Sequence, residues 1–80
     1  MALVVFSSEQ QRLTGEASAE VSARNYRDLV AELLARYPRL DADEMARMAL
    51  VLDGVIIHDP LLEEIPAHSE VHFLHFVRGG

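Results

Sequence analysis

A single amphipathic stretch, from Asn25 to Tyr37, limits the folds available to this chain. Apolar side chains recur there at intervals of three and four residues, the spacing of one helical stripe: Tyr26, Leu29, Val30, Leu33, Leu34 and Tyr37. Asn25 is positioned to cap the first turn, and Pro38 ends the helix. Strand-like runs lie on both sides of it. Because one helix covers only one face of a sheet, we predict an α+β fold, a mixed sheet with one main helix packed on one face.

Five segments have the composition of β-strands, and they lie at residues 2–7, 16–22, 48–52, 55–58 and 70–77. The first and the last are apolar on both faces, which favours places side by side in the middle of the sheet. The second is expected to run antiparallel to the first, with its alanines and valine facing inward. Asp53-Gly54 predicts a two-residue turn between the third and the fourth. Residues 7–14 are expected to be irregular, and 41–45 and 61–65 to form single helical turns.

The side chains of the last strand alternate between two faces. We assign the following residues to the core beneath the helix: Val71, Phe73, Leu50, Leu52, Leu3 and Val5. The remaining apolar residues and one histidine are expected on an open face: His72, Leu74, Phe76, Val51, Val4 and Phe6. An apolar patch with a polar rim is typical of a docking surface, so we predict that a partner protein binds there. Two alternatives are a scatter of solvated side chains and a patch covered by a second copy of the chain.

The charge of the chain excludes several classes of function. Thirteen acidic residues stand against seven arginines with no lysine, which gives a net charge of −6. This charge argues against nucleic acid as a partner and favours a partner with basic patches. The chain contains no cysteine, and His72 and His75, three apart on a strand, point to opposite faces, so we expect no metal site. Neither a catalytic triad nor a phosphate-binding loop is present, which predicts no self-contained catalytic site.

The two ends of the sequence carry further expectations. The apolar run after Met1 is short and lacks a basic leader, so we expect a cytoplasmic protein that does not enter a membrane. At the other end, we expect a folded domain over residues 1–76 and a flexible tail over residues 77–80, Val77-Arg78-Gly79-Gly80. Glycines without a Cβ suit a tail that enters a narrow channel, and four extended residues reach at most about 14 Å. Arg78 is expected either to pair with acidic groups of a partner or to remain solvated.

Taken together, these features resemble a known family. The strand order, the Arg12-Leu13-Thr14-Gly15 segment, the Asp53-Gly54 turn and the terminal Gly79-Gly80 are similar to the MoaD and ThiS proteins. These are β-grasp sulfur carriers related to ubiquitin, and the resemblance covers essentially the whole chain. It is strongest to MoaD, the small subunit of molybdopterin synthase.

The resemblance implies a β-grasp fold and a specific chemistry at the tail. An E1-like activating enzyme would adenylate Gly80 with ATP, and a sulfur donor would displace AMP to leave a thiocarboxylate. An acceptor enzyme, such as the large subunit of molybdopterin synthase, would then receive the sulfur. The chain itself would be a carrier without a bound cofactor. Its reacting residues would be Gly79 and Gly80, and its partner-binding residues Val51, His72, Leu74, Phe76, Val77 and Arg78.

Other products and roles stay open. MoaD proteins typically end in Pro-Pro-Val-x-Gly-Gly, whereas this chain ends in His75-Phe76-Val77-Arg78-Gly79-Gly80. A sulfur carrier for thiamine, cysteine or a secondary metabolite is therefore an alternative. The Arg-Gly-Gly ending is also similar to that of ubiquitin, so a protein modifier is a second alternative, and a passive interaction domain is a third.

Overall fold

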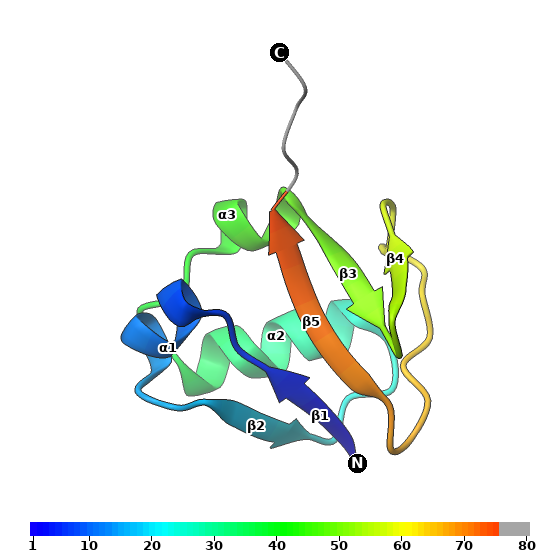
Figure 1. Cartoon of the computed structure of the whole chain (residues 1–80), viewed down its shortest axis with the longest axis horizontal. Helices are drawn as coiled ribbons and strands as arrows, with labels where there is room; N and C mark the ends of the chain where they lie inside the picture. The colour runs from blue at the N-terminus through cyan, green and yellow to red at the C-terminus, as the bar shows by residue number, and fades with distance from the viewer. Residues whose placement is uncertain (76–80) are drawn as a thin grey trace.

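The computed structural model describes residues 1–75 of the chain. The predicted tail at residues 77–80, and Phe76 before it, lie outside the described residues. Helices and strands follow one another in the order β1 (Ala2–Val5), α1 (Ser8–Thr14), β2 (Ser18–Val21), α2 (Tyr26–Arg36), α3 (Ala42–Ala46), β3 (Met48–Leu52), β4 (Val55–Ile57) and β5 (Glu70–His75) (Figure 1).

The five strands form one mixed sheet in the order β2-β1-β5-β3-β4. The central strands β1 and β5 run parallel, and every other neighbouring pair is antiparallel (Figure 1). The predictions of a mixed sheet, of the first and last strands side by side, and of an antiparallel second strand are therefore confirmed. Asp53 and Gly54 join β3 to β4 with φ angles of 48° and 83°, the positive values that a two-residue primed turn requires.

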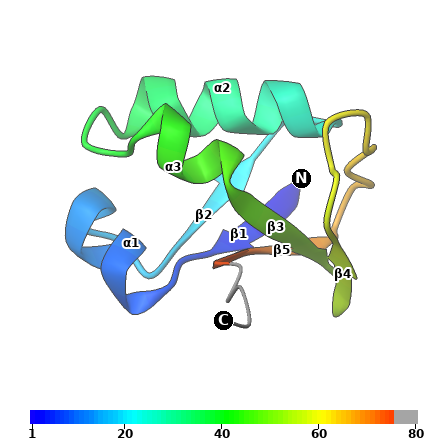
Figure 2. The same ribbon diagram turned by 90° about the horizontal axis from the view of Figure 1, so that it is seen from above.

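Helix α2 lies across one face of the sheet (Figure 2). Its cap is the predicted one, because the Asn25 side chain accepts a hydrogen bond from the Asp28 amide at 2.9 Å. The apolar stripe faces inward, where Leu29 and Leu33 are fully buried. Arg36 donates to the Glu20 carbonyl at 3.0 Å and so ties the helix to edge strand β2. The main helix and its position on one face are confirmed.

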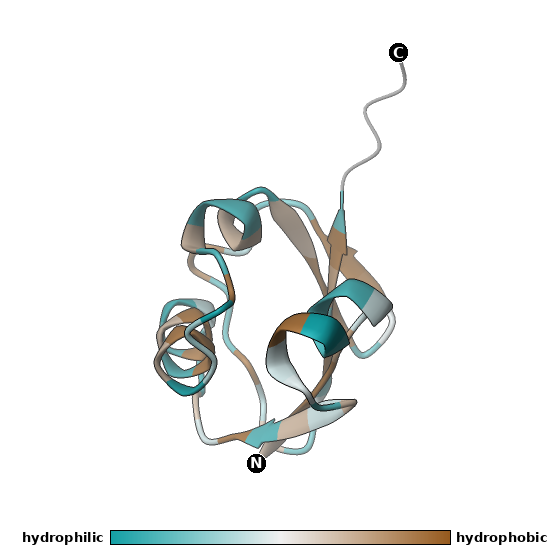
Figure 3. Ribbon diagram, turned by 90° about the vertical axis from the view of Figure 1, so that its left-hand side faces the viewer, coloured by the Kyte–Doolittle hydropathy of each residue, from teal (hydrophilic) through white to brown (hydrophobic). Residues whose placement is uncertain are grey.

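The core fills the space between α2 and the sheet. Val71 and Phe73 of β5 and Leu50 of β3 are buried there, as predicted, and Leu52 packs against them partly buried. Figure 3 views the molecule from the side of α1 and shows hydrophobic residues along the strands of the sheet, with mixed colours along α1. Burial of this apolar surface is the main stabilising contribution in a domain of this size.

Strand β1 faces the opposite way from the prediction. Val4 and Phe6 are buried in the core, whereas Leu3 is 36% exposed and Val5 is partly exposed. The reason is the parallel register, in which Val4 pairs with Val71 and therefore shares its face. The Phe6 ring then meets the Tyr37 ring edge-on, with centroids 5.5 Å apart.

Two loop predictions were also wrong. Residues 8–14 form helix α1, because Ser7 and Gln10 build a reciprocal capping box at its start. Gly15 ends the helix with a φ of 76°. Residues 61–65, by contrast, form a turn followed by an isolated bridge from Glu64 to Asn25 rather than a helical turn.

Two smaller predictions concern α3 and β2, and one of them was correct only in part. The short helix after Asp41 is confirmed as α3, with the Asp41 side chain accepting from the Asp43 amide. In β2, Ala19 and Val21 face the core as predicted, but Ala17 lies before the strand and is exposed.

Candidate functional site: the open face and the end of β5

The face of the sheet opposite α2 is built by alternate residues of four strands. The ladder places Leu74 beside Ala49 and His72 beside Val51, and the hairpin adds Ile56 next to Val51. Paired residues of adjacent strands project to the same side of a sheet. We define the open face as Leu3, Val5, Val51, Ile56, His72 and Leu74.

The open face is apolar and accessible. Leu74 is 45% exposed, Ile56 is 49% exposed and Leu3 is 36% exposed. Helices α2 and α3 both stand on the opposite side of the sheet (Figure 2). A contiguous exposed apolar patch with polar neighbours is typical of a protein-binding surface.

At the border of the open face, His72 interacts with an acidic neighbour, Glu70. His72 Nε2 lies 3.0 Å from a carboxylate oxygen of Glu70, two residues earlier on the same face. Glu70 is held in turn by the Asp53 side chain, which accepts from its backbone amide at 2.8 Å. The imidazole is therefore oriented at the border of the patch, where it can contact a partner.

The structure brings together three of the predicted docking residues, Val51, His72 and Leu74. The predicted site residues Phe76, Val77, Arg78, Gly79 and Gly80 lie outside the described residues.

Ile56 was not among the predicted docking residues, and Leu3 and Val5 were predicted to lie in the core. Ile56 could have been found, because a two-residue turn at Asp53-Gly54 necessarily sets residue 56 opposite Val51.

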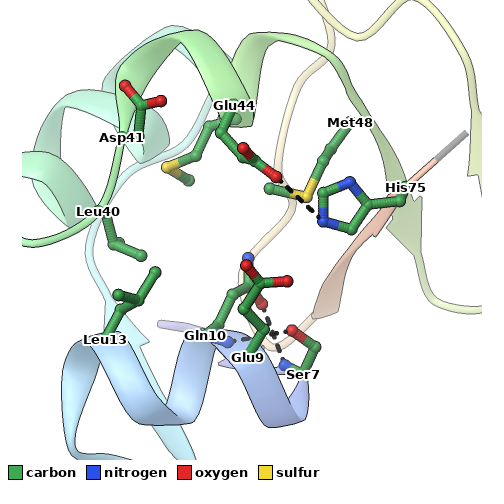
Figure 4. A pocket seen from close by; sticks show the side chains of 10 residues that line it. Ser7, Glu9, Gln10, Leu13, Leu40, Asp41, Glu44, Met48 and His75 are labelled. Atoms are coloured by element: carbon green, nitrogen blue, oxygen red, sulfur yellow. Dashed lines mark hydrogen bonds and ion pairs between the residues drawn. The ribbon is translucent and has the colours of Figure 1, made fainter.

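A small pocket lies at the end of β5, on the helical side of the sheet. It opens between α1, α3 and the last described residue of β5, His75, and has a volume of about 60 Å³ (Figure 4). His75 Nε2 lies 3.4 Å from a carboxylate oxygen of Glu44 in α3. The open face and this pocket therefore flank the point at which the chain continues into residues 76–80.

Three further features of the described residues bear on function. Within residues 1–75, no group of three His, Cys, Asp or Glu side chains is placed to hold a metal ion. None of the helices in that range has both the length and the apolar character of a membrane span. Burial raises the pKa of the Tyr26 phenol, but this side chain belongs to the apolar stripe of α2. The open face remains the feature of the described domain that is typical of a binding surface.

Comparison with known proteins gives one family and several similar folds. The model of the ThiS family matches residues 4–80. The chain is similar to a chain in the BexX/CysO complex of Amycolatopsis orientalis, with 18% identity and a TM-score of 0.78 over 100% of both chains. It is also similar to a Pyrococcus furiosus protein described as a molybdopterin converting factor, subunit 1, with 20% identity and a TM-score of 0.74 over 95% of this chain and 97% of that one.

A third similar structure is SAMP1 from Haloferax volcanii, with 16% identity and a TM-score of 0.70 over 99% of this chain and 98% of that one. No curated protein matches the sequence. At these identities the structural likeness shows the fold, and the predicted β-grasp architecture is confirmed.

Proposed function

Because the chain belongs to the ThiS family, we propose that it is a sulfur carrier that holds sulfur as a thiocarboxylate at Gly80. The observation that carries this proposal is that the family match extends from β1 through Gly79 and Gly80. A domain with an exposed apolar face and no metal-binding group of side chains among its described residues suits a carrier whose partners supply the catalytic groups.

The proposed chemistry starts from the carboxylate of Gly80. A terminal carboxylate has a pKa of about 3.5, so it is ionised at neutral pH and is a poor electrophile. It attacks the α-phosphorus of ATP in an activating enzyme, and pyrophosphate leaves. Hydrosulfide from a sulfur donor then attacks the acyl carbon of the adenylate, AMP leaves with the electron pair of the broken C–O bond, and loss of the S–H proton leaves a thiocarboxylate. Its sulfur is the nucleophile that an acceptor enzyme uses.

The open face is proposed to dock the activating enzyme. Leu74 and His72 lie on the strand that leads directly to residues 76–80, so a partner bound there is already positioned for the tail. Docking and chemistry would then use different parts of the chain. The sheet binds the partner, and the two glycines allow the tail to enter its active site. Phe76 and Val77 are proposed to extend the contact, and Arg78 to pair with acidic groups of the partner.

For the product, we propose molybdopterin. The similarity to the Pyrococcus furiosus converting factor supports this choice, with the large subunit of molybdopterin synthase as the acceptor. A carrier for cysteine or thiamine uses the same first two steps and differs only in the acceptor enzyme.

A protein modifier is the second candidate, and the Arg78-Gly79-Gly80 sequence favours it. Such a modifier could be attached to other proteins. It could not form chains through lysine side chains, because the sequence contains none.

The proposal is tested by measuring the intact mass of the protein after incubation with ATP, an activating enzyme and a sulfur donor. Replacement of oxygen by sulfur adds about 16 Da to the covalently charged carrier. Gly80→Ala should slow this gain by about 100-fold, because a Cβ displaces the reacting carbon in a narrow channel.

Gly54→Ala is the matched control. It makes the same change at a turn with a φ of 83° and should lower stability while leaving the mass gain intact. An equal mass gain in Gly80→Ala would contradict the mechanism. Isopeptide-linked bands would support the modifier, and an unreactive terminus would leave a passive interaction domain.

A further inference from the structure

The pocket at the end of β5 has apolar walls and a polar floor. The walls are supplied by Leu13 of α1, Leu40, Met45 of α3 and Met48 at the start of β3. Three of these four residues are buried members of the core, so the walls are rigidly held. His75, the last described residue of β5, closes one side of the pocket (Figure 4).

The floor contains an unsatisfied hydrogen-bond donor. Gln10 is only 4% exposed, and its Oε1 accepts from the Ser7 amide at 3.0 Å in the capping box of α1. That bond fixes which end of the amide is the oxygen, because a backbone N–H needs an acceptor. The Nε2 group is therefore a donor, it is buried, and it has no partner among the described residues. A buried donor without a partner destabilises the protein unless a ligand or water accepts from it.

Three carboxylates lie at the rim of the pocket, and one of them is unpaired within residues 1–75. Asp41 caps α3 by accepting from the Asp43 amide, and Glu44 pairs with His75. The Glu9 side chain has no hydrogen bond or ion pair with any group in the described range. Glu9 and Gln10 are adjacent in α1 and project toward the same space (Figure 4). The pocket therefore presents one free donor and one free acceptor between apolar walls.

We propose that this pocket receives a tyrosine side chain of the activating enzyme, as a second docking point in addition to the open face. The phenol oxygen accepts from Gln10 Nε2, the phenol proton is donated to the Glu9 carboxylate, and the ring packs against the methionine sulfurs. The identity of this partner rests on the function proposed above. The chemistry of the occupant follows from the pocket alone.

Other occupants match the pocket less well. An ammonium or guanidinium group carries only donors, so it would pair with Glu9 but leave Gln10 Nε2 unpaired. A carboxylate would accept from Gln10 but would be repelled by Glu9 and Glu44. A purely aliphatic side chain would leave both polar groups unsatisfied. A hydroxyl on an aromatic ring is the side-chain group that satisfies the donor, the acceptor and the apolar walls together.

The test is an NMR titration of the full chain, isotope-labelled, with p-cresol as the probe. The side-chain amide signal of Gln10 should shift and saturate with a Kd of about 1–10 mM, the range expected for so small a ligand. The side-chain amide of Gln11, which donates to the Phe6 carbonyl instead, should not shift. p-Methylanisole, which lacks the donor, and n-butylammonium, which lacks the acceptor, should each bind about tenfold more weakly.

A pair of variants supplies the control. Glu9→Ala should weaken p-cresol binding by about three- to tenfold, whereas Glu16→Ala, an exposed carboxylate outside the pocket, should not change it. No shift at about 50 mM p-cresol, or n-butylammonium binding as tight as p-cresol, would overturn the proposal. Normal thiocarboxylate formation without p-cresol binding would remove this inference alone. Binding of p-cresol without any mass gain would remove the proposed function, and with it the identity of the partner, but would leave the pocket as a site for a phenol.

Discussion

The two faces of the sheet differ strongly in exposure, although similar residues build them. On β5, Phe73 is 6% exposed and the next residue, Leu74, is 45% exposed, although both are large and apolar. The difference arises because α2 lies over the face that contains Phe73 and not over the face that contains Leu74. Apolar side chains on the covered face stabilise the domain, whereas those on the open face remain available for a partner. One alternating strand thus contributes one set of side chains to the core and exposes the other.

The largest effect is expected from shortening the covered face of β5. Phe73→Ala should lower the free energy of unfolding by about 3–5 kcal/mol, because it removes a buried ring and leaves a cavity under α2. Leu74→Ala, one residue further on, should cost less than about 1 kcal/mol. Urea denaturation of both variants measures the difference. Equal losses would mean that the two faces are not distinct.

A charge on the open face should weaken docking rather than folding. Leu74→Glu is expected to raise the Kd for the activating enzyme by about 30-fold, as for a central interface residue worth about 2 kcal/mol. Leu62→Glu is the control, because Leu62 is 87% exposed in the loop before β5 and does not belong to the open face. If Leu74→Glu unfolded the domain, or if both variants weakened binding equally, the assignment of the faces would be wrong.

The corrected orientation of β1 can be tested with two neighbouring substitutions. Val4→Thr should lower the free energy of unfolding by roughly 1–2 kcal/mol, since it buries a hydroxyl in an apolar environment without changing volume. Leu3→Thr should change it by less than about 0.5 kcal/mol. Thermal or urea unfolding compares the two. The reverse order of effects would restore the orientation predicted from the sequence.

The smallest effect is a loss of stability at alkaline pH. Burial raises the pKa of Tyr26 above its ordinary value of 10.0, so the unfolded chain ionises first as the pH rises. The contribution of the neutral phenol is therefore complete below about pH 10 and is lost as the pH rises through the folded-state pKa. No lysine titrates in this range. Tyr26→Phe should flatten the decline in a series of urea unfolding curves, and an unchanged decline would show that the phenol on the covered side is not its source.

Local signals in the sequence predicted the elements with strong patterns. The stripe of α2 and its Asn25 cap, the Asp53-Gly54 hairpin and the long last strand were all correct. Helix α1 was missed because its segment is polar and Leu13 is its only large apolar residue. Its signal was the pair Ser7 and Gln10, three residues apart, which form the capping box.

The sequence by itself determined that a single long helix covers one face of a mixed sheet, because its pattern contains one long apolar stripe among several strand-like runs. It also placed Val51, His72 and Leu74 on the uncovered side, since alternation along β5 ties them to the buried positions of Val71 and Phe73.

The tertiary structure decided what alternation alone leaves open. In β1 both sets of alternate residues are apolar, so only the pairing of Val4 with Val71 could select the buried set. The pocket between α1, α3 and His75 likewise exists only when three segments distant in the sequence meet. Periodicity reports which residues share a face, but which face is covered depends on long-range contacts that no local pattern contains.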